Sequence, residues 1–224
     1  MLEAAADRIA TVVDDADAVL QVGAAVSPFE RADWVLDDEP YEPNGSARYS
    51  RTSWVTRDVC GREPWPFADG RFAFAVCTSL ALARDPIGVC AELSRVARAG
   101  YVEVPTIEAE LAGGSARWLC DVSDAELVFV HKDAALLSDP RVRVPARWST
   151  RLEASDRVTG LFWDARLPAR ERLVDTPTLA GELAERLRQR FEPTTAEVAL
   201  VEARRLGGMA GSEVWRRLDQ FRSR

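Results

Sequence analysis

The stretch 52–105 constrains the fold of this chain most strongly, because it contains a strand, a helix and a second strand with clear boundaries. Residues 72–77 are apolar throughout, as is typical of a central strand in a parallel sheet. A helix is predicted to begin after Asp85, and residues 101–104 predict the next strand, which Pro105 closes. Two strands around a helix form a βαβ unit, and the loops after such strands make the ligand crevice of open α/β sheets. The segment therefore predicts both a fold and the place of a site.

Further elements on the N-terminal side extend this unit into a larger sheet. Apolar residues at helical spacing predict a first helix over 2–14, and short apolar runs predict strands over 18–22, 34–36 and 54–57. The connection between the first two of these strands is short, so Ser27-Pro28 is expected to start no more than a turn or so of helix. The pattern predicts an α/β fold with a Rossmann-like, doubly wound and mostly parallel sheet.

The helix inside the βαβ unit carries its own start and stop signals. Asp85 is the expected N-cap and Pro86 suits the first turn. Gly100 is the expected C-terminal stop. Apolar residues at helical spacing between these signals predict that one face of the helix is buried.

The pattern changes after the fifth predicted strand. A β-hairpin addition is expected there, followed by one more strand and by C-terminal helices. These elements are predicted over 118–122, 127–131, 158–164 and 179–191, with a capping box at 194–197 and a last helix after Ser212. No internal repeat and no linker are visible, so a single domain over 1–224 is the simplest architecture.

Composition excludes several classes of protein. The formal net charge of -7 and the pI near 5.0 argue against a nucleic-acid binder that works through a broad basic surface. Four cysteines without CxxC spacing and a single His make a zinc site improbable, so no metal is expected. No signal peptide and no apolar run near 18 residues are visible, which predicts a cytoplasmic protein without a membrane partner.

Several short motifs follow one another in an order that resembles a known family. They are Val19-Leu20-Gln21-Val22-Gly23, Asp37, Asp58, Pro66-Phe67-Ala68-Asp69-Gly70-Arg71-Phe72, Asp85-Pro86 and Glu92-Leu93-Ser94-Arg95-Val96. Together they resemble class I S-adenosylmethionine-dependent methyltransferases, specifically small bacterial methyltransferase-domain proteins. The resemblance covers about residues 18–105 and is weak from 106 onward. It implies a cofactor-binding half over 18–105, a β-rich substrate-side addition over 106–165 and C-terminal helices over 178–224.

The resemblance implies a role for five residues toward S-adenosylmethionine. Gly23 would let backbone approach the ligand, because a Cβ atom there would obstruct it. Asp37, with Asp38 as a neighbouring candidate, would accept hydrogen bonds from the ribose hydroxyls. Asp58 would accept from the adenine amino group, and the Val59 amide would face adenine N1. The segment 77–79, beginning with Cys77, would lie at the methionine part and the methyl acceptor.

Each of these residues also has a structural explanation. Gly23 also suits an ordinary turn, and Asp37 and Asp58 also suit polar strand ends. Two carboxylates that end adjacent predicted strands favour the functional interpretation, because both would open onto one edge of the sheet. Glu103, Glu108 and Glu110 have two interpretations as well: they suit a cationic acceptor or a base, and equally a solvated surface.

The chain departs from the family pattern at three places. Gln21 stands where an acidic residue is usual, and Ala73 stands where Asp is common. The segment 80–83 is apolar and lacks the His that relatives often carry, so no general base is evident. The favoured hypothesis is an enzyme that transfers methyl from S-adenosylmethionine to a small-molecule acceptor. The alternatives are a degenerate, non-catalytic binding or interaction module and a reaction other than methylation. A homodimer contact through the basic last helix is a further hypothesis.

Overall fold

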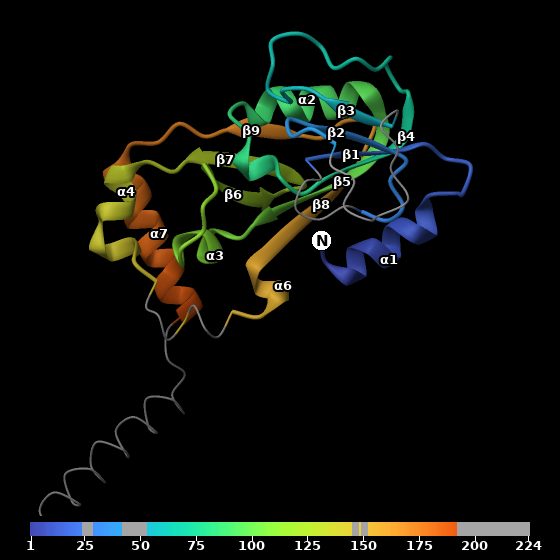
Figure 1. Cartoon of the computed structure of the whole chain (residues 1–224). Coiled ribbons are helices and arrows are strands. Elements are labelled where there is room, and N and C mark those ends of the chain that lie inside the picture. Colours follow the sequence, from blue (N-terminus) through green and yellow to red (C-terminus); the bar gives the residue numbers. More distant parts are fainter. Residues whose placement is uncertain (24–28, 42–52, 145–147, 149–151, 192–224) are drawn as a thin grey trace, which may run out of the picture. The chain divides into compact units, whose positions relative to one another are not determined.

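The computed structural model describes residues 1–23, 29–41, 53–144, 148 and 152–191 (Figure 1). Its compact unit runs from Met1 to Leu183 and contains both sheets. Ala184–Arg224 forms a second unit, of which the described part, to Phe191, completes helix α7 (Thr176–Phe191). The expected helix start at 27–28, the capping box at 194–197 and the last helix after Ser212 lie outside the described residues.

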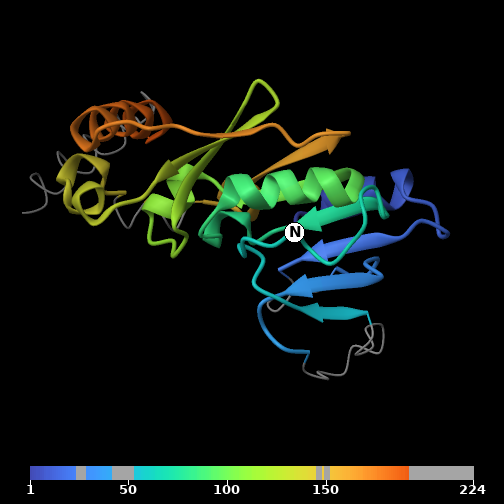
Figure 2. The same ribbon diagram turned by 90° about the horizontal axis from the view of Figure 1, so that it is seen from above.

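The larger sheet has six strands in the order β3-β2-β1-β4-β5-β8. They are β1 (Val19–Val22), β2 (Trp34–Asp37), β3 (Trp54–Thr56), β4 (Phe72–Cys77), β5 (Ala97–Pro105) and β8 (Val158–Asp164). The first five run parallel, and β8 runs antiparallel to β5 at the edge (Figure 2). The chain starts at β1 and reverses the direction of winding after β3, which makes the sheet doubly wound and mostly parallel, as predicted.

One described helix covers each face of this sheet (Figure 1). Helix α1 (Glu3–Val12) buries Ala5 and Ile9 in a cluster with Val19, Val35, Phe74, Val76 and Tyr101. Helix α2 (Pro86–Val96) packs on the other face, where it buries Val89, Cys90 and Leu93 with Leu20, Val22 and Cys77. Asp85 caps α2 as predicted, since its Oδ1 accepts from the Gly88 N–H at 2.9 Å. Both faces are apolar because each strand residue points to one of two buried layers.

The predicted helix stop at Gly100 is wrong. Helix α2 ends at Val96, and Gly100 lies inside β5, paired with Ala75 of β4 and Trp163 of β8. A Cβ atom at Gly100 would lie 2.5 Å from the Trp163 ring and closer still to the Ala75 carbonyl oxygen. The residue is therefore small because an indole packs over the strand at that point, and it does not terminate a helix.

The predicted hairpin is present and belongs to a second sheet. Strands β6 (Trp118–Ser123) and β7 (Glu126–His131) pair antiparallel, and β9 (Ala169–Glu171) adds to β7 in parallel. Asp124 and Ala125 form the turn with φ angles of 52° and 59°, the backbone of a tight two-residue hairpin. The range 106–165 is thus divided: the hairpin forms the second sheet and β8 joins the first. The sequence did not predict β9, because three residues carry no periodicity.

Short helices surround the second sheet. They are α3 (Ile107–Leu111), α4 (Ala134–Ser138) and the 3-10 turn η2 (Pro140–Val142), whereas α6 (Ala154–Arg157) leads directly into β8 of the first sheet. A third apolar cluster joins Ile107 and Leu136 to Leu119 of β6 and Leu179 of α7. None of the described helices is both long enough and apolar enough to cross a membrane.

Candidate functional site

The carboxyl ends of the parallel strands open into a cavity of about 620 Å³. All five residues that the sequence proposed for a cofactor line this cavity: Gly23, Asp37, Asp58, Val59 and Cys77. They come from the ends of, or from loops just after, β1, β2, β3 and β4. Ligand sites of open α/β sheets occupy this edge, and their volumes are typically about 300–1,000 Å³. The fold therefore gathers residues that are up to 54 positions apart into one concave site.

Gly23 closes the inner wall of the cavity directly after β1. Its φ angle is +71°, and its N–H donates to the Leu36 carbonyl of β2 at 3.0 Å. A Cβ atom at this position would lie 2.7 Å from the Cβ of Ser79 and closer still to its hydroxyl. Both the backbone conformation and the close approach of the Ser79 loop require glycine here.

Replacing Gly23 by alanine should lower the free energy of unfolding by about 2 kcal/mol, because strain at positive φ adds to the collision with Ser79. In a chain of this size that corresponds to a loss of roughly 4–8 °C in Tm. Gly70→Ala is the matched control, since Gly70 has a φ of +62° and a Cβ atom there would have no other atom within 4 Å. Thermal unfolding should show the smaller loss for Gly70→Ala. Equal losses would show that Ser79 moves aside without cost and that only backbone strain counts.

Asp37 ends β2 and is 2% exposed. Its Oδ1 accepts from the Glu39 N–H at 2.9 Å, which holds the carboxylate at the strand end. The neighbouring Asp38 hydrogen-bonds to Asp37, and this bond, with partial burial, raises the pKa of the Asp38 carboxyl. Both carboxyls line the cavity. The pair offers acceptor oxygens of the kind that ribose hydroxyls require.

Asp58 and Val59 lie two and three residues beyond β3. One Asp58 oxygen accepts from the Cys60 N–H at 3.0 Å, and the other is ion-paired with Arg84 Nη2. The Arg84 guanidinium lowers the pKa of Asp58, which keeps this half-exposed carboxylate charged. The Val59 N–H donates to no atom in the part of the chain that the structure describes, so a donor lines the cavity beside this acceptor. No sequence signal indicated Arg84, because it lies 26 residues from Asp58.

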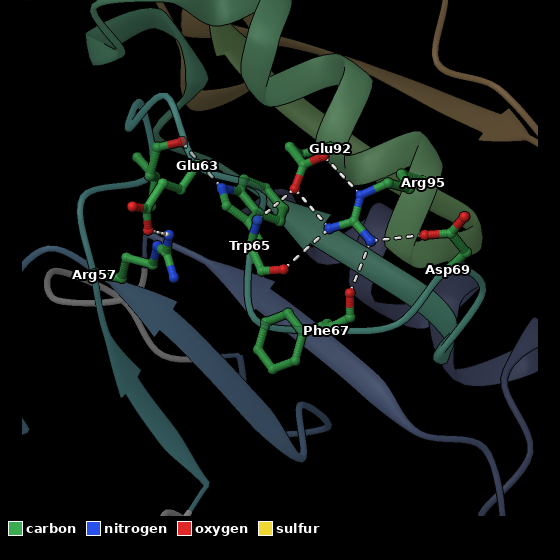
Figure 3. Close-up of polar contacts among 8 residues, drawn as sticks. Arg57, Glu63, Trp65, Phe67, Asp69, Glu92 and Arg95 are labelled. Atoms are coloured by element: carbon green, nitrogen blue, oxygen red, sulfur yellow. Dashed lines mark hydrogen bonds and ion pairs between the residues drawn. The ribbon is translucent and has the colours of Figure 1, made fainter.

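Arg95 of α2 clamps the loop that carries these two residues (Figure 3). Its guanidinium donates to the carbonyls of Trp65 and Phe67, at 3.1 and 2.8 Å, and to the carboxylates of Asp69 and Glu92. The pKa of Glu92 is lowered, first by Arg95 and also by the Trp65 N–H, which donates to it at 2.6 Å. Every N–H of the arginine is thereby used, a geometry that only the planar guanidinium provides.

Trp65 connects the Arg95 network to the cavity. Its ring is 3% exposed, and its Nε1–H donates to the Val59 carbonyl at 3.1 Å. The peptide that follows Val59 is therefore oriented by the side chain of a residue whose backbone N–H and carbonyl are held by Glu92 and Arg95 (Figure 3). The sequence indicated the Pro66–Phe72 and Glu92–Val96 motifs separately, and the structure brings them together as one network.

Cys77 ends β4 and is 1% exposed. Burial raises the pKa of its thiol, so the side chain remains an uncharged thiol and is no nucleophile. The next residues, Thr78 and Ser79, line the cavity, and the 3-10 turn η1 (Leu80–Leu82) adds apolar wall. This end of the cavity presents hydroxyl and apolar groups next to the strand edge.

Gln21 lies outside the main cavity. It is 1% exposed and lines a second, smaller cavity on the α1 side of the sheet. Its Oε1 accepts from the Phe29 N–H at 2.7 Å, which ties β1 to the segment that leads into β2. The amide at this position has a structural contact of its own.

Glu103, Glu108 and Glu110 are 5%, 7% and 4% exposed, so the interpretation as solvated surface residues is wrong for all three. Glu110 forms a buried ion pair with Lys132. Glu103 lines the main cavity from β5. Among the described residues no group of three or more His, Cys, Asp and Glu side chains is arranged to hold a metal ion.

No family model and no curated protein matches the sequence. Solved structures that are similar to the chain include an S-adenosylmethionine-dependent methyltransferase from Mesorhizobium loti, 14% identical over 80% of this chain and 78% of that one, with a TM-score of 0.34. Another, from Aquifex aeolicus, is 12% identical over 70% and 87%, with a TM-score of 0.35. A third, from Thermotoga maritima, is 17% identical over 47% and 51%, with a TM-score of 0.34.

These structures are named for the same class that the sequence motifs resemble. The chain spans only 51–57% of the length of three of the similar structures. The class of fold rests on the strand order of this chain itself, which is that of a Rossmann-like, doubly wound α/β domain.

Proposed function

We propose that this chain binds S-adenosylmethionine in the cavity and transfers its methyl group to a small-molecule acceptor. One observation carries the proposal: Gly23, Asp37, Asp58, Val59 and Cys77, chosen from the sequence alone, all line a single cavity at the ends of four adjacent parallel strands. The cavity thus combines a backbone donor at Val59, a buried and a half-exposed carboxylate and a glycine wall in one space of ligand size.

The proposed arrangement follows the order of the strands. Adenine would lie beyond β3, with its amino group toward Asp58 and N1 toward the Val59 N–H. The ribose hydroxyls would donate to Asp37 at the end of β2. The backbone at Gly23 would admit the sulfur-bearing part beside β1, and Cys77 and Thr78 would line the methionine part at β4. These residues bind and orient; the cofactor, when bound, supplies an activated methyl group.

The chain's own contribution to transfer would be alignment. The part of the wall that Leu80, Leu82 and Ala83 form next to Cys77 is apolar and has no titratable side chain. Holding donor and acceptor in line supplies up to roughly 7–11 kcal/mol of a bimolecular barrier. An acceptor with a lone pair that is free at neutral pH needs no further activation, and we propose such an acceptor.

Calorimetric titration of the full chain with S-adenosylhomocysteine tests cofactor binding directly. A ligand at 100 times its Kd should stabilise the fold by about 2.7 kcal/mol. This corresponds to a rise of roughly 5–11 °C in Tm. If millimolar ligand produces neither a heat of binding nor a change in Tm, the proposal is wrong.

A non-catalytic binding module is the second candidate. The apolar turn Leu80–Leu82 favours it, because the side chains of this turn that line the cavity offer no proton acceptor. Ala73, the other departure from the family pattern, lies near the amino end of β4 and is not part of the cavity lining. Release of S-adenosylhomocysteine from S-adenosylmethionine in the presence of an acceptor supports the enzyme. Tight cofactor binding without turnover over a broad acceptor panel supports the module.

We further propose that the chain forms one methyltransferase-like domain, that the protein is cytoplasmic and that it is a homodimer. Light scattering measures the oligomeric state.

A further inference from the structure

The end of β5 places a buried carboxylate in the wall of the cavity. Glu103 directly follows Val102, which pairs with Cys77 of β4, and its side chain is 6% exposed. Oε2 of Glu103 accepts from the Leu2 N–H at 2.8 Å and from the Tyr101 hydroxyl at 2.9 Å. Burial and the nearby Glu103 charge raise the pKa of Tyr101, so the hydroxyl keeps its proton and donates. One oxygen of Glu103 is thus held from both sides.

The other oxygen already receives an amino group. Oε1 of Glu103 lies 3.4 Å from the Met1 amino nitrogen, its partner among the described residues, and Met1 itself lines the cavity. Glu110, the other glutamate with a buried ion pair, has Lys132 and the Ala116 N–H fixed within the protein. Glu103 differs because its cationic partner is a terminal group at the cavity. Oε1 of Glu103 therefore has room for a nitrogen donor beside it.

The charge of the residues that line the cavity also favours a cationic ligand. The described lining contains five carboxyl side chains, Asp37, Asp38, Glu39, Asp58 and Glu103, against the Arg84 guanidinium and the Met1 amino group. Arg84 is already paired with Asp58. A concave site lined mainly by one sign of charge raises the local concentration of ions of the opposite sign. The cavity should therefore prefer cations.

The place of Glu103 along the sheet separates it from the proposed cofactor contacts. Asp58 follows β3 and Glu103 lies on β5, with β2, β1 and β4 between them. Neighbouring strands are about 4.8 Å apart, so four steps across the sheet correspond to roughly 19 Å. A cofactor whose adenine lies at β3 and whose methionine part lies at β4 leaves the β5 end of the cavity to another molecule.

We propose that Glu103 binds an ammonium group of the methyl acceptor, so that the acceptor is a cationic amine. That the bound amine is the methyl acceptor rests on the proposed function. That Glu103 binds an ammonium rests on the geometry of β5. The incoming ammonium replaces the Met1 amino group at Oε1, while Leu2 and Tyr101 continue to hold Oε2. The inference concerns recognition: the bound ammonium has no free lone pair, so the methylated atom is another atom of the acceptor.

Matched amine and alcohol pairs test this directly. Ligand-observed NMR titrations would compare butylamine with butanol and 2-phenylethylamine with 2-phenylethanol, on the full chain with a free N-terminus, saturated with S-adenosylhomocysteine. We expect each amine to bind at least about tenfold more tightly than its alcohol, since a charge-assisted hydrogen bond distinguishes them. Glu103→Gln should remove this preference. Glu39→Gln, the same change on an exposed carboxyl at the β2 end of the cavity, should retain it.

Three results would overturn the inference: no preference for amines in the wild-type protein, a preference that survives in Glu103→Gln, or an equal loss in Glu39→Gln. Unchanged affinity for S-adenosylhomocysteine shows that Glu103→Gln is folded. If it does not fold, Glu103→Asp, which withdraws the carboxylate by one methylene, should reduce the preference at least threefold. If S-adenosylhomocysteine does not bind the wild-type protein, the titrations are run without it: the proposed function falls, whereas an amine preference that depends on Glu103 stands.

Discussion

Replacement of Asp37 by alanine should weaken the binding of S-adenosylhomocysteine by roughly 100-fold, because two hydrogen bonds from ribose hydroxyls to a carboxylate would be lost. Asp37 is 2% exposed and lies at the end of β2, where the Glu39 N–H holds its Oδ1 in place. Isothermal titration of the purified variant measures the loss, and far-UV circular dichroism verifies that the sheet is intact.

Two further variants separate the carboxylate's charge from its place in the fold. Asp37→Asn retains an oxygen that can accept from the Glu39 N–H, and it should weaken binding about tenfold. Asp38→Asn changes the exposed neighbour, whose raised pKa reflects its bond to Asp37, and it should change the affinity less than threefold. If Asp37→Ala and Asp38→Asn bind S-adenosylhomocysteine with the same affinity, the ribose does not lie at the end of β2 and the proposed orientation is wrong.

Replacement of Arg95 by alanine should lower the free energy of unfolding by about 3 kcal/mol, because the carbonyls of Trp65 and Phe67 and the Glu92 carboxylate would lose a charged donor. For a chain of this size the loss corresponds to roughly 6–12 °C in Tm. We also expect about tenfold weaker binding of S-adenosylhomocysteine, since the loop from Asp58 to Asp69 is held on α2 by this side chain (Figure 3). Thermal unfolding and calorimetry measure the two effects separately.

Arg57→Ala is the matched control for this prediction. Arg57 forms an ion pair with Glu63 in the same loop, but the Glu63 side chain is 86% exposed, and such pairs contribute less than about 1 kcal/mol (Figure 3). Arg95→Lys keeps the positive charge but lacks the planar guanidinium. Its Tm should lie between those of the wild-type protein and Arg95→Ala. Similar Tm values for Arg57→Ala and Arg95→Ala would show that the Arg95 network does not hold the loop.

Much of the main sheet follows from local patterns. The strand at Phe72–Cys77 has the predicted bounds, and the cap at Asp85 and the hairpin at 118–131 are where the sequence indicated them. These features depend on neighbouring residues: apolar runs, a side chain that accepts from an N–H three positions later, and a polar turn between two strands. Strand β9 and the end of helix α2 were not predicted, because both depend on contacts with distant strands.

The candidate site was predicted in part. Five residues were placed at one edge of the sheet, and the fold brings all five to one cavity, because the carboxyl ends of parallel strands share an edge. Arg84 and Trp65 were not assigned to the site, and Glu103 was named as a candidate for a cationic acceptor or a base without its burial or its partners being predicted. Their partners, Asp58, Val59 and the Met1 amino group, lie 26, 6 and 102 positions away in the chain, and no local pattern links such pairs.

By itself, then, the sequence determined that the chain forms a doubly wound α/β sheet and which strand ends carry polar residues, since hydrophobic periodicity and capping are local properties. Only the tertiary structure decided that Gly100 makes room for Trp163, that Asp58 is paired with Arg84, and that Glu103 is buried at the cavity with an amino group against it. Burial and pairing depend on which distant segments meet, and that is fixed only when the sheet and its loops pack together.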